Sequence, residues 1–258
     1  MFFTAPIEGY PIVVATHMRS GTHLTIDMLR RQFTSVGGWK WPGEANDSVY
    51  LALDVMSGLQ ANWGERRGFR ILRRSKHPIC KVHWTAPDFA DLAKLQPELA
   101  TWILNRGRVI YVIRDPKKVM ASMLAWELSA NDSHRKPDDI ESWIVPKLNY
   151  WASHVNQWVD RPGTLVLRFE DIVKRPKTVV KDVARHLGLE PSWREPLLPP
   201  KLRGHWHSRL NRVISIRPVC TEILTQVPAA AATARIGALA DDLWETHCGE
   251  VMRRFGYA

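Results

Sequence analysis

Short runs of apolar and β-branched residues alternate along this chain with longer segments of helical pattern. Four such runs occupy residues 11–15, 78–82, 108–113 and 164–169. Near-continuous apolar runs of this length are typical of strands that are buried on both faces of a sheet. Strands that alternate with helices pair in parallel through right-handed crossovers. The pattern predicts an α/β fold with a central, mostly parallel sheet of four to five strands flanked by helices.

Capping residues place some of the helix boundaries. Asp115 occupies an N-cap position and Pro116 the first helical position after the third run. After the fourth run, a helical pattern ends at Gly188, a typical C-cap. The Ala-rich stretch 229–240 predicts another helix. Because the 258 residues contain no repeat and no low-complexity linker, we expect a single domain over residues 1–258.

The charge balance is strongly basic, with 36 Lys and Arg against 26 Asp and Glu, a formal net charge of +10. The excess is spread along the chain, which favours a small polyanionic ligand over nucleic acid. The 3 cysteines include no CxxC pair, so we expect a reducing, cytoplasmic location. The first eight residues do not resemble a signal peptide, and no apolar run approaches the ~18 residues of a membrane span.

The first strand leads into a loop and then a helix, the order expected of a phosphate cradle. The loop reads Thr16-His17-Met18-Arg19-Ser20-Gly21-Thr22-His23. Backbone N–H groups and the dipole of the helix start attract an anion, and Ser20 and Thr22 add hydroxyl donors. The Walker A pattern is absent, since the loop has one Gly and its basic residue precedes that Gly. An ordinary strand-to-helix turn explains this segment alone at least as well.

Two further strand ends carry residues that suit a polyanion. The third strand ends in Arg114, with Ser122 two turns into the next helix, and an Arg fork there could grip a second phosphate. The second strand ends at Lys81 and His83, which alternation places on the same side. A His of near-neutral pKa can act as a general base, and a Lys can stabilise developing negative charge. Taken singly, Arg114 can also be a surface side chain beside a capping Asp, and a single histidine such as His83 is more often structural.

Together, in order and spacing, these motifs resemble those of the sulfotransferases that use 3′-phosphoadenosine 5′-phosphosulfate (PAPS). The Arg19-Ser20-Gly21-Thr22 segment is similar to their P-loop-like 5′-phosphosulfate loop, where cytosolic members usually have Lys in place of Arg19. The segment from Arg114 to Ser122 is similar to their 3′-phosphate motif, and Lys81-Val82-His83 to the segment that holds their catalytic His. The resemblance covers residues from about 12 to 188.

The resemblance implies transfer of a sulfuryl group from PAPS to a hydroxyl or amine of a small-molecule acceptor, with PAP as the product and no metal. It assigns proton removal to His83 and charge neutralisation to Lys81 and Arg19. Leu24 stands where an adenine-stacking Trp is common, and Phe169 is a candidate adenine contact. A late basic loop, shortened here, completes the cofactor-binding set, which is Arg19, Ser20, Gly21, Thr22, His23, Arg114, Ser122, Arg203 and Gly204.

Two other classes of function stay open on the sequence. A P-loop-like nucleotide kinase would need a loop Lys and a metal carboxylate; the Glu170-Asp171 pair is structural in the sulfotransferases. A non-catalytic basic nucleotide- or nucleic-acid-binding protein would explain the charge, but it predicts Arg and Lys clustered on one face. The sequence leaves the acceptor and the oligomeric state open. Four of the 12 Trp lie near the expected acceptor pocket, where indole rings suit an aromatic or cationic acceptor: Trp39, Trp41, Trp63 and Trp84.

Overall fold

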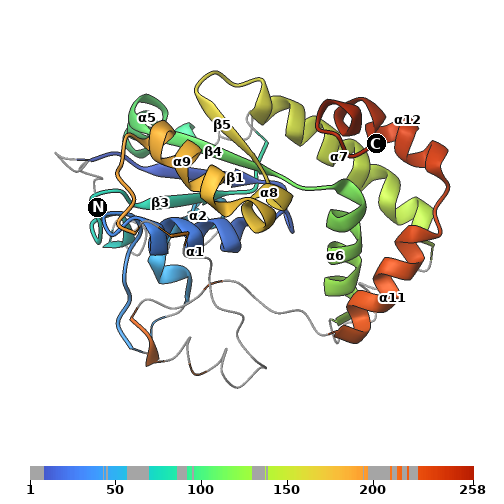
Figure 1. Ribbon diagram of the computed structural model, residues 1–258, viewed down its shortest axis with the longest axis horizontal. Helices are drawn as coiled ribbons and strands as arrows, with labels where there is room; N and C mark the ends of the chain where they lie inside the picture. The colour runs from blue at the N-terminus through green and yellow to red at the C-terminus, as the bar shows by residue number, and fades with distance from the viewer. Residues whose placement is uncertain are drawn as a thin grey trace.

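The computed structural model describes residues 9–42, 44, 46–56, 70–85, 92–94, 96–129, 137, 139–193, 195–196, 210, 214–216, 220 and 226–258. Within these residues, five parallel strands form one sheet in the order β2-β3-β1-β4-β5 (Figure 1). The strands are β1 (Ile12–Thr16), β2 (Leu51–Ala52), β3 (Ile79–Val82), β4 (Arg108–Ile113) and β5 (Thr164–Arg168). The predicted α/β fold is therefore confirmed.

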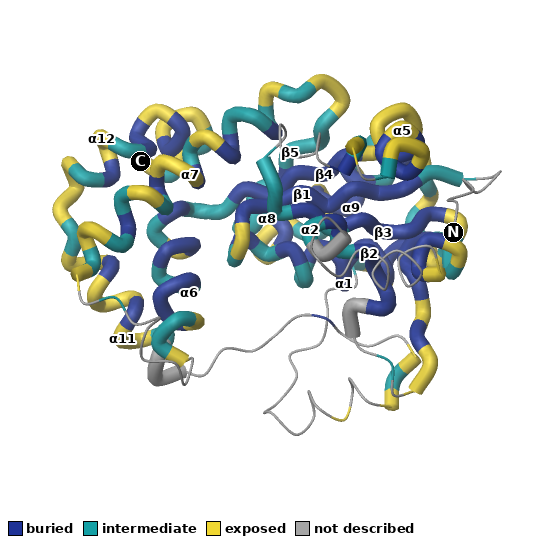
Figure 2. Tube along the Cα trace, turned by 180° about the vertical axis from the view of Figure 1, so that it is seen from behind, coloured by how far each residue is buried: buried dark blue, intermediate teal, exposed yellow. Residues whose placement is uncertain are grey.

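Helices cover both faces of this sheet. They are α1 (Thr22–Gln32), α2 (Leu53–Met56), α5 (Pro97–Arg106), α6 (Pro116–Ser129), α7 (Ile140–Val159), α8 (Phe169–Lys174), α9 (Pro176–Leu187), α11 (Gln226–Gly237) and α12 (Asp241–Arg254), with a 3-10 turn η1 (Asn46–Val49). Ile12 and Val14 of β1 pack with α1, α8 and α9, whereas Val13 and Ala15 pack with α5, α6 and α7. The strands β1, β3 and β4 are buried along most of their length between these layers, whereas the edge strand β5 is mostly half-buried (Figure 2). No helix of the described part is long and apolar enough to cross a membrane.

The element boundaries agree closely with the sequence pattern. Each predicted strand lies within one residue of a strand in the structure. Asp115 caps α6, since its Oδ1 accepts a hydrogen bond from the N–H of Lys117 at 2.9 Å. Gly188 ends α9 with a left-handed φ of 63°. Phe169, predicted as the last residue of a strand, instead begins α8.

Parallel pairing places the carboxyl ends of the strands at one edge of the sheet. Ala15 lies opposite Val82 on β3, and Thr16 lies opposite Val112 on β4. The strand order reverses at β1, because β3 pairs on one side of it and β4 on the other. In open α/β sheets, the crevice at such a point is where ligands bind. This edge lies toward α6 and α7 (Figure 1).

Candidate active site

A cavity of about 510 Å³ lies at the carboxyl edge of the sheet, within the ~300–1,000 Å³ typical of small-molecule sites. Residues from all the predicted motifs that the structure describes line it. They are Arg19, Gly21, Thr22, His23, Lys81, His83, Arg114 and Ser122, and the lining is completed by Met18, Leu24, Trp126 and Phe169. Arg203 and Gly204 of the predicted late loop lie outside the described residues.

The loop between β1 and α1 contains two residues with left-handed backbone. Arg19 has φ 66°, and Gly21, the N-cap of α1, has φ 105°. A Cβ on Gly21 would lie 2.3 Å from Cδ2 of Phe169, so only a glycine lets this ring approach the loop. The first N–H groups of a helix have no intrahelical acceptor, and the dipole there favours an anion. This geometry supports the phosphate-cradle interpretation of the loop.

Ser20 differs from the other predicted loop residues. It is fully buried and is not part of the cavity lining. Its Oγ has no hydrogen-bond partner among the described residues. Its N–H donates to the carbonyl of His17 at 3.2 Å. The structure thus places Ser20 in the fold of the loop and not at the cavity surface.

Direct hydrogen bonds join the loop to the motif after β4. Arg114 Nη1 donates to the carbonyl oxygen of Arg19 at 2.9 Å. Arg19 Nε donates in turn to Ser122 Oγ at 3.2 Å. The guanidinium of Arg114 also lies over the ring of Phe169, 4.4 Å from its centroid, in a cation–π contact. Residues about a hundred positions apart therefore form one connected unit.

The lining of the cavity is rich in positive charge. Arg19, Lys81 and Arg114 contribute cationic side chains, and none of the described lining residues is Asp or Glu. Cations gathered in a partly enclosed cavity raise the local concentration of an anionic ligand. The cavity is suited to a small ligand with several negative charges.

His83 is fixed through both its ring and its main chain. Its Nδ1–H donates to the carbonyl oxygen of Thr16 at 2.8 Å, which leaves the lone pair on Nε2. Its backbone N–H donates to Asp54 Oδ1 at 3.1 Å. Burial first, and then the charge of Lys81, lower the pKa of His83 to about 4, with a smaller contribution from Arg19. The near-neutral pKa expected from the sequence is therefore wrong, and the imidazole is neutral at pH 7, as a general base requires.

Some residues of this site were not predicted from the sequence. Trp126 lines the cavity and is 45% exposed; its spacing of four from Ser122 places both on one face of α6 and could have revealed it. Thr16 was predicted only as part of the loop, but its Oγ1 lies 2.5 Å from Thr22 Oγ1. Asp54 follows β2, a strand of two residues that is too short to give a pattern, so no local signal marked it.

Carboxylates near the cavity are engaged by protein groups. Glu170 Oε2 accepts a hydrogen bond from the Tyr257 hydroxyl at 3.0 Å. Asp171 pairs with Arg175 at 2.8 Å. In the described part of the chain, no group of three or more His, Cys, Asp or Glu is arranged to hold a metal ion.

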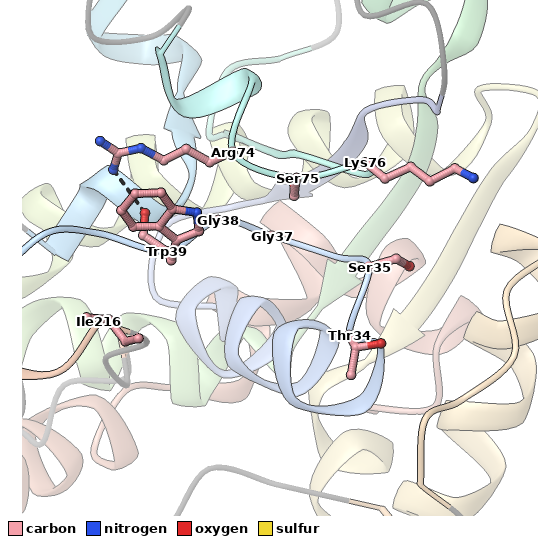
Figure 3. Close-up of a pocket in the computed structure, with 9 residues that line it drawn as sticks. All are labelled: Thr34, Ser35, Gly37, Gly38, Trp39, Arg74, Ser75, Lys76 and Ile216. Carbon is pink, nitrogen blue, oxygen red and sulfur yellow. Dashed lines mark hydrogen bonds between the residues drawn. The ribbon is translucent and has the colours of Figure 1, made fainter.

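A second cavity, of about 360 Å³, lies where α1 ends and β3 begins, at the opposite edge of the sheet (Figure 3). Arg74 and Lys76 are cations of its lining, and Arg74 is already paired, with hydrogen bonds to both carboxylate oxygens of Glu44 at 2.8 and 2.9 Å. Arg74 also donates to the carbonyl of Trp39 at 2.9 Å. Trp39, predicted near the acceptor pocket, lines this cavity and not the one that His83 lines. Trp63, predicted near the same pocket, lies outside the described residues.

Comparison with known proteins identifies a family for this arrangement. The model of the sulfotransferase domain family matches residues 10–206, which include every described residue of the cavity lining. No curated protein sequence matches this chain significantly.

Solved sulfotransferase structures show weaker similarity. A mouse sulfotransferase in complex with PAP is 16% identical, over 73% of this chain and 61% of that chain, with a TM-score of 0.47. A sulfotransferase from Mycobacterium avium is 14% identical, over 72% and 65%, with a TM-score of 0.47. One from Alicyclobacillus acidocaldarius is 12% identical, over 92% and 99%, with a TM-score of 0.46. This chain thus spans about three fifths of the mouse protein, and the family assignment rests on the match over residues 10–206.

The contact between Gly21 and Phe169 makes a testable prediction. We expect Gly21→Ala to lower the melting temperature more than a substitution at an unobstructed glycine, because the new Cβ adds a collision with Phe169 to the left-handed strain. Gly188→Ala is the matched control, since Gly188 also has positive φ but a Cβ there meets nothing within 4 Å. Thermal unfolding of the parent and of both variants measures the difference. Equal effects in the two variants would show that Phe169 does not constrain the loop.

Proposed function

The chain belongs to the sulfotransferase domain family, and from that premise we propose that it transfers a sulfuryl group from PAPS to a small-molecule acceptor and releases PAP. One observation carries the proposal: a single cavity gathers the loop of Arg19, the Arg114–Ser122 motif and a neutral His83. The cations suit the phosphates of the donor, and the lone pair of His83 suits an acceptor proton. In this proposal, residues 1–258 act as one sulfotransferase domain.

The donor phosphates divide between the two motifs of the cavity. The start of α1, with Gly21, Thr22 and His23, holds the 5′-phosphosulfate through its N–H groups and hydroxyl. Arg114 and Ser122 hold the 3′-phosphate, the Arg through its fork of N–H donors. Ser20 supports the loop from its buried position, and Arg203 and Gly204 remain candidates for the late loop that returns to the 3′-phosphate.

The chemical step is a displacement at sulfur. His83 Nε2 takes the proton of the acceptor hydroxyl or amine while the acceptor atom forms its bond to sulfur. The bond from sulfur to the phosphate oxygen breaks, and PAP leaves with the electron pair. Lys81 and Arg19 neutralise the charge that builds on the bridging oxygen and the sulfuryl oxygens. No step requires a metal.

The acceptor would enter beside His83 and Lys81. Trp126 and Met18, exposed by 45% and 47%, supply apolar surface at this cavity, and an indole suits an aromatic or cationic acceptor. We propose a cytoplasmic location, since the chain has 3 cysteines and no CxxC pair, a cysteine usage typical of a reducing compartment. Neither nucleic acid nor a membrane is part of the proposal.

The direct test compares donors. We expect PAP or PAPS to raise the melting temperature while ATP with Mg²⁺ does not, and we expect turnover of PAPS to continue in excess EDTA. Stabilisation by ATP with Mg²⁺, together with activity that chelation abolishes, would favour a P-loop-like nucleotide kinase. Binding of PAP without turnover of any acceptor would favour a non-catalytic nucleotide-binding protein.

Arg114 should determine selectivity for the 3′-phosphate. We expect PAP to bind much more tightly than 5′-AMP, and Arg114→Ala to remove about 2–3 kcal/mol of that preference, the size of a charge-assisted hydrogen bond. Arg108→Ala is the control, because Arg108 lies at the other end of the same strand and should leave the preference unchanged. Calorimetry of PAP and 5′-AMP binding measures this preference in the parent and in both variants. Equal affinities for PAP and AMP in the parent protein would exclude this role.

His83 should be essential for turnover but not for donor binding. We expect His83→Ala to lower kcat by roughly 10² to 10⁴, the range for a positioned general base, with PAP affinity nearly unchanged. His247→Ala on α12 controls for the loss of a histidine as such. A variant that retains its turnover would remove His83 from the mechanism.

The pH profile provides a second readout for the same residue. A base acts unprotonated, so activity is present above its pKa and is lost as the pH falls through it. Because the pKa of His83 is lowered to about 4, kcat/KM of the parent should stay level from pH 8 to well below 6.5 before it falls. Lys81→Met removes a charge that lowers this pKa and should move the acid limb to higher pH. A limb that stays in place in Lys81→Met would contradict the assignment.

A further inference from the structure

Three side chains of α7 donate hydrogen bonds to the main chain directly after β3. Tyr150 Oη donates to the carbonyl oxygen of His83 at 3.3 Å, and His154 Nε2 donates to the same oxygen at 3.2 Å. Trp158 Nε1 donates to the carbonyl oxygen of Trp84 at 2.9 Å. The three donors are spaced four residues apart, so they form one stripe along the helix. We call Tyr150, His154 and Trp158 the donor stripe.

The donor stripe acts where strand pairing has ended. The ladder between β1 and β3 extends to Val82, opposite Ala15. The carbonyls of His83 and Trp84 lie beyond it on half-buried residues, and a carbonyl that is partly withdrawn from water needs a partner from elsewhere. α7 supplies these partners across the top of the sheet. The main-chain carbonyl groups of His83 and Trp84 are therefore held by α7 and not by a neighbouring strand.

His154 is the central member of the stripe, and its tautomer is determined by a buried neighbour. It is fully buried, and the Tyr111 hydroxyl donates to its Nδ1 at 2.9 Å. A ring that accepts at Nδ1 carries its proton on Nε2, the nitrogen that faces the carbonyl of His83. Burial first, and then the nearby His17 and His83, lower the pKa of His154 to about 3. The ring is neutral at pH 7 and has one donor and one acceptor, both of them used.

We infer that the donor stripe of α7, centred on His154, positions His83 for catalysis by holding the carbonyl groups of His83 and Trp84. The inference rests on the proposed function, since it assigns a purpose to the orientation of a catalytic base. Thr16 fixes the ring at Nδ1 and Asp54 fixes the backbone N–H, and the stripe fixes the other side of the peptide chain. Together these contacts fix the direction in which Nε2 of His83 points relative to the loop between β1 and α1. Because a shift of about 1 Å at a reacting group can cost 10²-fold in rate, this support matters for turnover.

The experiment compares two substitutions of His154. Gln can offer an amide N–H close to the position of Nε2, whereas Met fills similar volume without a donor. We expect His154→Met to lower kcat by roughly tenfold to 100-fold with little change in KM for PAPS or in PAP affinity. We expect His154→Gln to retain most of the parental kcat. His186→Met on α9 is the control for replacing a histidine elsewhere.

Folding defects are separated by further variants. Met at position 154 leaves the Tyr111 hydroxyl without an acceptor, so the Tyr111→Phe/His154→Met double variant removes both polar partners together and should recover thermal stability but not kcat. Trp158→Phe keeps an aromatic ring and removes only the N–H. We expect Trp158→Phe to reduce kcat less than His154→Met does, because the carbonyl that Trp158 binds belongs to Trp84 and not to His83 itself. Recovery of kcat together with stability in the double variant would show that His154 serves packing alone.

Nitrogen NMR of histidine-labelled protein tests the geometry without any turnover. The parent should show His154 protonated on Nε2 and His83 protonated on Nδ1, and His154→Met should shift the His83 ring signals while His154→Gln restores them. The opposite tautomer at His154, or His83 signals that are unchanged in His154→Met, would overturn the inference. Equal losses of kcat in the Met and Gln variants would overturn it as well. A parent protein that fails to use PAPS would refute the proposed function instead, and the NMR result would still decide how His83 is held.

Discussion

The left-handed backbone of Arg19 is the strained point on which the cavity depends. A non-glycine residue in this conformation costs roughly 1–2 kcal/mol, and such strain persists only where surrounding contacts hold it. Here the contacts come from the far side of the cavity, because Arg114 binds the carbonyl of Arg19 and Ser122 binds its side chain. The loop after β1 and the motif after β4 thus shape each other, and neither is complete without the parallel pairing of the two strands.

A second consequence concerns the way in which the fold holds its histidine. His83 lies just beyond a short strand, where the ladder ends at Val82. Contacts from β1, α2 and α7 replace the missing strand partners, through Thr16, Asp54 and the donor stripe. Groups on three different elements must be in place before the ring has one orientation. The site is therefore a product of the whole sheet edge and not of the Lys81-Val82-His83 segment alone.

Local signals explain what the sequence could predict. The apolar runs, the cap at Asp115 and the left-handed Gly188 depend on near neighbours, and all were placed within a residue or two. The motifs were placed at one edge because parallel strands end together. The features that were not predicted depend on residues distant in the sequence. Strand β2 has only two residues and therefore no pattern. The burial that lowers the pKa of His83 comes from the packed fold and cannot be read from the residues next to it in the sequence. Trp158 is buried, and its hydrogen bond to Trp84 depends on the packing of α7 against the end of β3.

The cations of the cavity connect donor binding to the basicity of His83. Lys81 and Arg19 are among the groups that lower the pKa of this histidine, and in the proposed reaction they also bind the negative charge of the donor. A bound polyanion offsets their field, so the pKa of His83 rises toward its ordinary value. The imidazole then binds a proton more strongly while it remains mostly neutral at pH 7. Burial, the largest cause of the lowered pKa, remains when the donor is bound, so the donor strengthens the base only by the part that Lys81 and Arg19 contribute.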